Sequence, residues 1–292
     1  MKRSLLDRAA WAVAGALAVA VIASYAGIVR GGPLDPPLPP GPTSPLVEPR
    51  TPISASGILI SQPGSYYLTR DITASPGQFG ISVIASDVTI DLNGFTLRGV
   101  VGAFDAIDLG FQNHNITVRN GAVAAWPGVA IRGASAIGVR YERLTIRSNT
   151  GGGIVAGANS MISDCVVSGN GGNGIEVAQP FTSGSGIVSG CIVDGSMLDG
   201  VLFDNNVTLS GNTITNNGAD GIHATDGGNR IDGNNLNGNT GKEIHVEGSG
   251  NTIVRNSFGG ADSDVSVVAG NTKGPTENGG TPLSNPWANI AY

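Results

Sequence analysis

From residue 80 onward the chain repeats a unit of about 23 residues, and this repeat restricts the fold more than any other feature. Each unit holds a triplet in which two apolar residues flank a variable one, and the first members of successive triplets are 21 to 26 residues apart. A unit of that length built from short strands cannot bury its apolar side alone, so neighbouring units must stack into a solenoid. The triplets begin at Ile81, Ile107, Val129, Ile154, Ile175, Val201, Ile222, Ile244 and Val265.

A second motif follows several of the triplets at a steady offset. Aligned on it, Asn212, Asn234 and Asn256 occupy one column of the repeat, and Cys165 and Cys191 occupy the same column in earlier units. Equivalent residues of stacked strands lie about 4.8 Å apart, which lets side-chain amides hydrogen-bond from turn to turn. The two cysteines are therefore expected to be neighbours, either as buried thiols or as a disulfide between turns.

The repeat contains two or three short strands and has no helical half. The 46 glycines of the 292-residue chain suit tight corners that need a positive φ. We therefore predict an all-β parallel β-helix of about nine turns over residues 80–270, with an amino-terminal cap at residues 54–79. Residues 271–292 are expected to form a tail or carboxyl-terminal cap.

The amino terminus differs from the rest of the chain. Basic residues precede an apolar run from Ala9 to Val29, so residues 1–31 are predicted to be an export signal. Ser24-Tyr25-Ala26 fits a signal-peptidase site, whereas an apolar run of about 20 residues is also long enough for a transmembrane anchor. Residues 32–53 hold 9 of the 16 prolines and read as an extended linker. An exported chain is expected in the cell envelope or outside the cell, with a membrane contact if the signal stays uncleaved.

The charge of the chain argues against nucleic acid as a partner. The net charge is −6, with 16 basic and 22 acidic residues. A polyanion needs a basic surface to bind, and the repeats carry an excess of acidic groups.

Three runs of sequence resemble exported bacterial right-handed parallel β-helix proteins of the pectate-lyase-like superfamily. They are residues 64–69 (GSYYLT), residues 87–97 (DVTIDLNGFTL) and residues 285–290 (NPWANI), and the resemblance covers about residues 55–292. It implies a right-handed helix whose ligands lie along one parallel sheet. The superfamily includes polysaccharide lyases, glycoside hydrolases, epimerases and noncatalytic surface proteins, so the resemblance leaves the activity open.

The catalytic signatures of the enzyme branches are missing from the sequence. It lacks the Asp-Pro-His pattern of alginate epimerases, the Trp-x-Asp-His pattern of pectate lyases and the successive motifs of polygalacturonases. We therefore predict a carbohydrate-facing binding or structural protein of an uncharacterised branch. The alternative is a polysaccharide lyase or glycoside hydrolase that uses the face of His223 and His245.

Two of the three histidines share one position of the repeat. His223 and His245 are the middle residues of consecutive triplets and should lie about 5 Å apart, with Glu176 two turns earlier in the same row. Such a group can act as a base or bind a metal, Ca²⁺ or another divalent ion. The competing interpretation is a solvated sheet face. The flanking polar residues considered with the pair are Asp220, Asp226, Lys242, Glu243 and Glu247.

A basic stretch precedes this region. Arg140 and Arg143 belong to a group of arginines in the early turns, and no Lys or Arg occurs between residues 148 and 229. Arginines can grip the carboxylates of an acidic glycan, so Arg140, Arg143, Asp220, Asp226 and Lys242 are candidate residues for binding a polysaccharide or cell-envelope glycan. Scattered surface ion pairs are the simpler interpretation.

Overall fold

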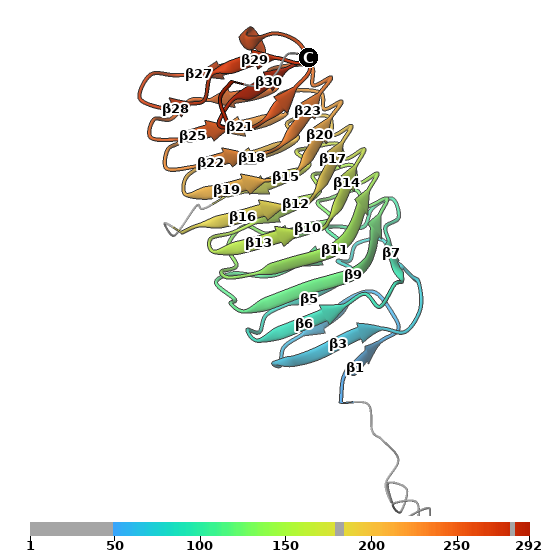
Figure 1. Ribbon diagram of the computed structural model, residues 1–292. Coiled ribbons are helices and arrows are strands. Elements are labelled where there is room, and N and C mark those ends of the chain that lie inside the picture. The colour runs from blue at the N-terminus through green and yellow to red at the C-terminus, as the bar shows by residue number, and fades with distance from the viewer. Residues whose placement is uncertain (1–48, 179–183, 281–283) are drawn as a thin grey trace, which may run out of the picture. The chain divides into compact units, whose positions relative to one another are not determined.

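The computed structural model describes residues 49–178, 184–280 and 284–292, in which short strands stack in parallel from β1 at one end to β29 and β30 at the other (Figure 1). The strands form two sheets of ten and twenty members, and the paired strands run parallel. The sequence-based prediction of an all-β parallel solenoid is confirmed. The predicted export signal lies outside the described residues, and among those described no helix is long and apolar enough to span a membrane.

The ten-stranded sheet contributes one strand per turn, so the solenoid has about ten turns, of which the predicted nine lie within residues 80–270. The additional strand is β2, which pairs with β5 and lies in the region predicted as a cap. The strands are β2 (Ile58–Ile60), β5 (Ile81–Val83), β8 (Ile107–Asp108), β10 (Ile131–Gly133), β12 (Ile154–Ala156), β15 (Ile175–Val177), β18 (Val201–Phe203), β21 (Ile222–Ala224), β24 (Ile244–Val246) and β27 (Val265–Val267).

The twenty-stranded sheet bends at a corner, so most turns add two strands to it. Its strands are β1 (Thr51–Ile53), β3 (Gly64–Leu68), β4 (Ile72–Thr73), β6 (Val88–Asp91), β7 (Thr96–Arg98), β9 (Ile116–Ala124), β11 (Arg140–Arg147), β13 (Ser160–Ser163), β14 (Val166–Ser168), β16 (Gly186–Ser189), β17 (Ile192–Asp194), β19 (Val207–Ser210), β20 (Thr213–Thr215), β22 (Arg230–Asp232), β23 (Asn235–Asn237), β25 (Thr252–Val254), β26 (Ser257–Phe258), β28 (Thr272–Lys273), β29 (Thr276–Asn278) and β30 (Asn289–Ala291). A short 3₁₀ turn, η1 (Asp262–Asp264), precedes β27.

The core is the inside of this coil, because the flanking members of each triplet point inward and the middle member points out. Most triplets of the ten-stranded sheet alternate buried, half-buried, buried, as β21 and β24 do. Ile, Val and Leu fill most of the interior, and burial of their apolar surface supplies the main stabilisation. This alternation decides which side chains are available to a ligand.

One triplet was assigned wrongly from the sequence. Ile131 pairs with Ile107 and Ile154, so β10 begins at Ile131 and its outward residue is Arg132, whereas the sequence predicted Ala130. The pattern misled because the inward position after Arg132 is Gly133, not an aliphatic residue. A Cβ there would collide with the Tyr141 hydroxyl, so the buried tyrosine takes the space of the missing side chain.

The predicted column of Asn and Cys residues is confirmed. Asn212 Nδ2 donates to Asn234 Oδ1 at 2.9 Å, Asn234 Nδ2 to Asn256 Oδ1 at 3.0 Å, and Asn256 Nδ2 to Asn289 Oδ1 at 3.1 Å. Asn212 Oδ1 also accepts the backbone N–H of Cys191, which places the cysteine at the head of the ladder. Asn289, in β30, closes the ladder at the carboxyl end.

Cys165 and Cys191 are both free thiols and both buried. Their sulfurs lie near the backbone carbonyls of Tyr141 and Ile162, at 3.7 and 3.8 Å. The neighbouring Cys191 thiol, and burial, raise the pKa of Cys165. Of the two states left open by the sequence, the structure contains the thiols.

Replacing an internal member of the ladder should destabilise the fold. Asn234→Ala leaves the Leu209 carbonyl and the Asn212 N–H without their partner, and each buried unpaired group costs about 1–3 kcal/mol. We expect the free energy of unfolding in urea to fall by about 2–4 kcal/mol. The matched control is Asn237→Ala on the exposed side of β23, which should change it by less than about 0.5 kcal/mol. Equal effects of the two substitutions would contradict a stabilising ladder.

Glu243 is a buried acid in a column that holds glycine at positions 200 and 221. Burial raises its pKa, while Asn239 Nδ2 donates to its carboxylate. A raised pKa in the folded state means that stability falls as pH rises from the unfolded value of about 4.3 through the folded value, and stays lower above it.

We therefore expect Glu243→Gln to match the parent protein in acid and to be more stable at neutral pH. Thermal unfolding across this pH range is the measurement. The matched control is Glu176→Gln at a half-buried position on the outer face, which should change the stability at neutral pH by less than about 0.5 kcal/mol. A Glu243→Gln protein that is less stable at neutral pH would contradict the cost assigned to the buried charge.

Candidate functional site

The outward residues of the ten-stranded sheet form one continuous row along the solenoid. The register of the paired strands fixes its members, and it differs from the predicted row in holding Arg132 in place of Ala130. The row mixes apolar, small and ionisable residues, and two ionisable residues of one kind, His223 and His245, are adjacent near the carboxyl end. In order it consists of Leu59, Ser82, Asp108, Arg132, Val155, Glu176, Leu202, His223, His245 and Ser266.

His223 and His245 are direct neighbours in this row, as their sequence positions predicted. Their imidazole rings stack with centroids 4.8 Å apart and planes 8° from parallel. The two side chains are 20% and 31% exposed, so both rings are partly open to solvent. Equivalent nitrogen atoms of the two stacked rings therefore lie side by side on adjacent strands.

Each imidazole is held by an aspartate from the preceding turn. His223 Nδ1 lies 3.1 Å from Asp199 Oδ2, and His245 Nδ1 lies 2.8 Å from Asp220 Oδ2. An ionised carboxylate only accepts hydrogen bonds, so Nδ1 of each ring carries the proton. In the neutral imidazole this leaves the lone pair on Nε2, the atom available to a metal or a substrate proton.

The two aspartates are themselves fixed by the backbone. Asp199 Oδ1 accepts the N–H of Asp220 at 2.9 Å, and Asp220 Oδ1 accepts the N–H of Lys242 at 2.5 Å. Each carboxylate therefore uses one oxygen to bridge consecutive corners and the other to hold a ring. Orientation of a histidine by a second hydrogen-bonded group is the arrangement found around reactive and metal-binding imidazoles.

An aspartate holds an outward side chain in the same way once more, near the amino end of the row. Asp105 Oδ1 accepts the N–H of Val129 at 2.6 Å, and Asp105 Oδ2 accepts from Arg132 Nε at 2.5 Å. This pairing raises the pKa of the Arg132 guanidinium. An aspartate two residues before one strand thus holds the outward cationic or basic residue of the next strand in all three cases.

Glu247 completes the group on the opposite edge of the rings. Its Oε1 lies 3.6 Å from His223 Nε2 and 3.8 Å from His245 Nε2, which is too far for a hydrogen bond. His223 Nε2 is buried and has no hydrogen-bond partner among the residues that the structure describes. Two ring lone pairs and a carboxylate oxygen therefore lie side by side at the same edge of the stacked rings. Asp220, His223 and His245 also bring potential ligand atoms within 4.8 Å of one another.

The other predicted site residues lie away from this group or play other parts. Glu176 is in the same row, but Leu202 separates it from His223, and its carboxylate accepts from Asn173. Asp226 is exposed in a turn and accepts the N–H of Gly227. Lys242 donates from Nζ to the Ser263 carbonyl and offers its backbone N–H to the site.

The predicted arginines belong to the other sheet. Arg140 and Arg143 are exposed on β11, and Arg143 donates to Asn120 Oδ1 and lies 3.8 Å from Glu142. The structure therefore does not bring them together with the histidine pair. Their part in glycan binding stays a prediction.

Sequence reasoning left Arg132 and Asp199 out of the site. The spacing of the repeat could have placed Arg132 in the outward row. A strand that begins at Ile131 is 24 residues after Ile107 and 23 before Ile154. This spacing is more even than the 22 and 25 residues obtained from Val129. The Asp-Gly pair that stands directly before a triplet at both 199–200 and 220–221 could have identified Asp199 as the equivalent of Asp220.

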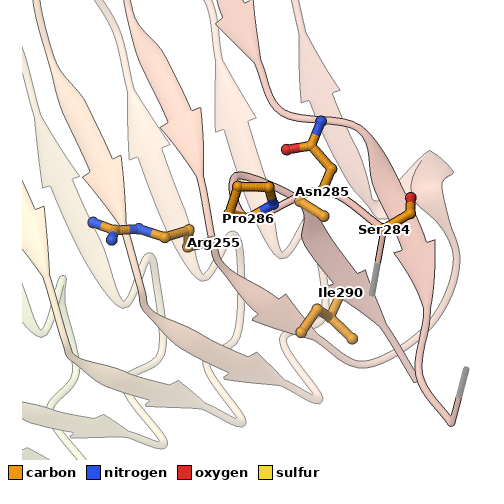
Figure 2. Close-up of a pocket in the computed structure, with 6 residues that line it drawn as sticks. Arg255, Ser284, Asn285, Pro286 and Ile290 are labelled. Carbon is orange, nitrogen blue, oxygen red and sulfur yellow. The ribbon is translucent and has the colours of Figure 1, made fainter. Parts of the chain in front are cut away.

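A pocket of about 410 Å³ lies elsewhere, at the carboxyl end (Figure 2). Its charged residue, Arg255, is bound by Asp232 and lies 5.3 Å from the centre of the Trp287 ring. Pairing with Arg255 and Arg230 lowers the pKa of Asp232. The arginine is thus engaged with the fold. The lining consists of Arg255, Ser284, Asn285, Pro286, Ala288 and Ile290.

Several solved structures are similar to this chain. The A-module of mannuronan C-5 epimerase AlgE6 from Azotobacter vinelandii matches at 17% identity and a TM-score of 0.48, over 82% of this chain and 86% of that one. The Dettilon tailspike protein matches at 11% identity and 0.43, over 83% and 61%. The A-module of AlgE4 from the same bacterium matches at 13% identity and 0.36, over 81% and 78%. No curated protein sequence matches.

The family comparison agrees with the architecture. The model described as "Right handed beta helix region" matches residues 111–258 and 199–274, which together span more than half of the chain. The matched residues include the strands that carry His223 and His245. With its parallel turns, inward triplets and corner ladder, the chain belongs to the right-handed β-helix family.

Proposed function

We propose that this chain is an exported, noncatalytic protein that binds carbohydrate along the outward row of the ten-stranded sheet, with His223 and His245 at the centre. The observation that carries the proposal is the stacked pair of imidazoles, oriented by Asp199 and Asp220 and partly open to solvent. Neighbouring turns repeat the same geometry, so the outward side chains lie at even spacing along a linear polymer and the polar ones can hydrogen-bond to it.

The chemistry of the site suits sugar hydroxyl groups. The unprotonated Nε2 of His245 accepts a hydrogen bond from a hydroxyl, and the 52% exposed Glu247 carboxylate accepts others. The resemblance of the sequence to the pectate-lyase-like superfamily supports a glycan as the polymer. Asp199, Asp220 and Glu247 surround the rings, so the site is acidic and favours an uncharged stretch of glycan over a uronate.

Export is a proposal from the amino-terminal sequence. The apolar run from Ala9 to Val29, preceded by basic residues, supports passage through a membrane and either cleavage or retention as an anchor. The proline-rich sequence that precedes β1, residues 32–50, supports a spacer between membrane and solenoid. A polysaccharide of the cell envelope is then the ligand within reach.

One observation favours a second function, that of a polysaccharide lyase or glycoside hydrolase. An imidazole held by a carboxylate at Nδ1 is arranged as a general base at Nε2. A lyase also needs a cation to stabilise the developing enolate. Arg132, the arginine of the row, is separated from His223 by Val155, Glu176 and Leu202, so we prefer binding without catalysis.

The test replaces both histidines in the full-length chain, as His223→Gln with His245→Gln. Neither side chain is in the core, so we expect a folded protein whose binding to immobilised neutral glycans falls at least about tenfold, the equivalent of 1.4 kcal/mol. The same assay on anionic polysaccharides, with absorbance of unsaturated products as a second readout, separates binding from lyase activity.

Two controls locate the site. His114→Gln changes the third histidine, which contacts Ser86, and should leave binding unchanged. Arg140→Ala with Arg143→Ala should also leave it unchanged. Binding that survives loss of the histidine pair and disappears with the arginine pair would move the site to β11. Release of unsaturated product would establish the lyase in place of the binding protein.

A further inference from the structure

We propose that His223 Nε2, His245 Nε2 and Glu247 Oε1 form a binding site for a transition-metal ion of the Zn²⁺ class. The inference needs no glycan and therefore goes beyond the proposed function. It starts from the converging acceptors on the outer edge of the two rings. Because Asp199 and Asp220 hold the protons on Nδ1, both Nε2 atoms face Glu247 as lone pairs.

Three hydrogen-bond acceptors lie close together with no donor from the described residues between them, and a bound cation would stabilise this arrangement. The distances from Glu247 Oε1 are 3.6 Å to one Nε2 and 3.8 Å to the other, and His223 Nε2 is buried and unpartnered. Ligand atoms around a tetrahedral Zn²⁺ lie about 3.3 Å apart, given metal–ligand bonds of about 2.0–2.2 Å. The two rings are stacked with centroids 4.8 Å apart, so binding of one ion by both Nε2 atoms requires their outer edges to tilt toward each other.

The donor set selects the kind of metal. Two imidazoles and one carboxylate suit Zn²⁺, Co²⁺, Ni²⁺ or Cu²⁺, whereas Ca²⁺ and Mg²⁺ prefer oxygen ligands throughout. Of the two expectations drawn from the sequence, a divalent metal other than Ca²⁺ is therefore the one we propose. Three protein ligands leave a fourth position open on the exposed side of Glu247, where water or a sugar hydroxyl can bind.

Asp199 and Asp220 act as positioning residues in this site. Both oxygens of Asp220 are engaged, one by His245 Nδ1 and the other by the Lys242 N–H, so its carboxylate orients a ring and leaves the metal to Nε2. Carboxylate–histidine–metal triads of this kind fix the tautomer and strengthen the ligand. The adjacent turns supply both triads because the strands are in register.

The experiment titrates the purified full-length chain, held in a nonionic detergent and carrying no polyhistidine tag, with ZnCl₂ by calorimetry at neutral pH. We expect one ion per chain. Titration with CoCl₂ provides a second readout, since tetrahedral Co²⁺ absorbs visible light far more strongly than the hydrated ion. Circular dichroism of each variant verifies the solenoid.

The variants separate ligands from positioning residues. His223→Gln with His245→Gln should abolish Zn²⁺ binding, and Glu247→Gln, at a half-exposed side chain, should weaken it more than the roughly 10- to 100-fold loss expected for Asp220→Asn. The amide introduced by Asp220→Asn can place a donor against His245 Nδ1 and so disfavour the required tautomer. His114→Gln is the matched control and should leave the affinity unchanged.

Several results would overturn the proposal. They are the absence of Zn²⁺ binding by the full-length chain, binding that survives the double histidine replacement, and unchanged affinity in Glu247→Gln. If the double variant fails to fold, Glu247→Gln still decides. A chain that binds Zn²⁺ but no glycan would retract the proposed function and leave the metal site standing.

Discussion

In-register parallel pairing of successive turns is the constraint on which the rest of this structure depends. It places each residue beside its equivalent in the next turn, so any side chain that recurs in the sequence becomes a contact in space. The consequence inside the coil is the ladder through Asn212, Asn234 and Asn256, which satisfies buried backbone groups at the corner. On the outside it is the stacked pair His223 and His245. In-register pairing thus produces both the buried amide ladder and the exposed histidine pair.

The periodicity of the sequence was sufficient to predict the fold, the corner column and the adjacency of the two histidines. It failed at residues 129–133, because the pattern of apolar residues treats Gly133 as a break when a buried tyrosine in fact fills its place. It also could not show that Asp199 and Asp220 reach forward by one turn to hold the rings, since that depends on side-chain direction at a corner. Glu243 stands next to the site in sequence, yet it points into the core, where a carboxylate is expensive.

The aspartates change what the histidines can do. Without the aspartates, each imidazole could carry its proton on either nitrogen, and neither tautomer would be favoured for binding a ligand at Nε2. With Nδ1 held by a carboxylate, each ring presents Nε2 as an acceptor, and the nearby Glu247 adds negative charge at the same point. Such a group of acceptors can bind a cation, accept a hydrogen bond from a hydroxyl group or take up a proton. The three possibilities correspond to metal binding, glycan binding and catalysis. The Asp105–Arg132 pair has the same corner geometry, with an arginine in place of the histidine. The same placement of aspartate at the corner thus holds an imidazole in two turns and a guanidinium in one.

The tautomer of the two histidines tests this account most directly. Long-range ¹⁵N–¹H correlation NMR of the metal-free protein, with ¹⁵N-labelled histidine and assignment by single replacements, reports which ring nitrogen carries the proton. The account predicts the Nδ1–H form for both His223 and His245, and a shift toward Nε2–H for His245 when Asp220 is replaced by asparagine. Protons on Nε2 in the unmodified protein would contradict it, because the lone pairs would then face the aspartates and the outer edge of the rings would offer a donor in place of an acceptor.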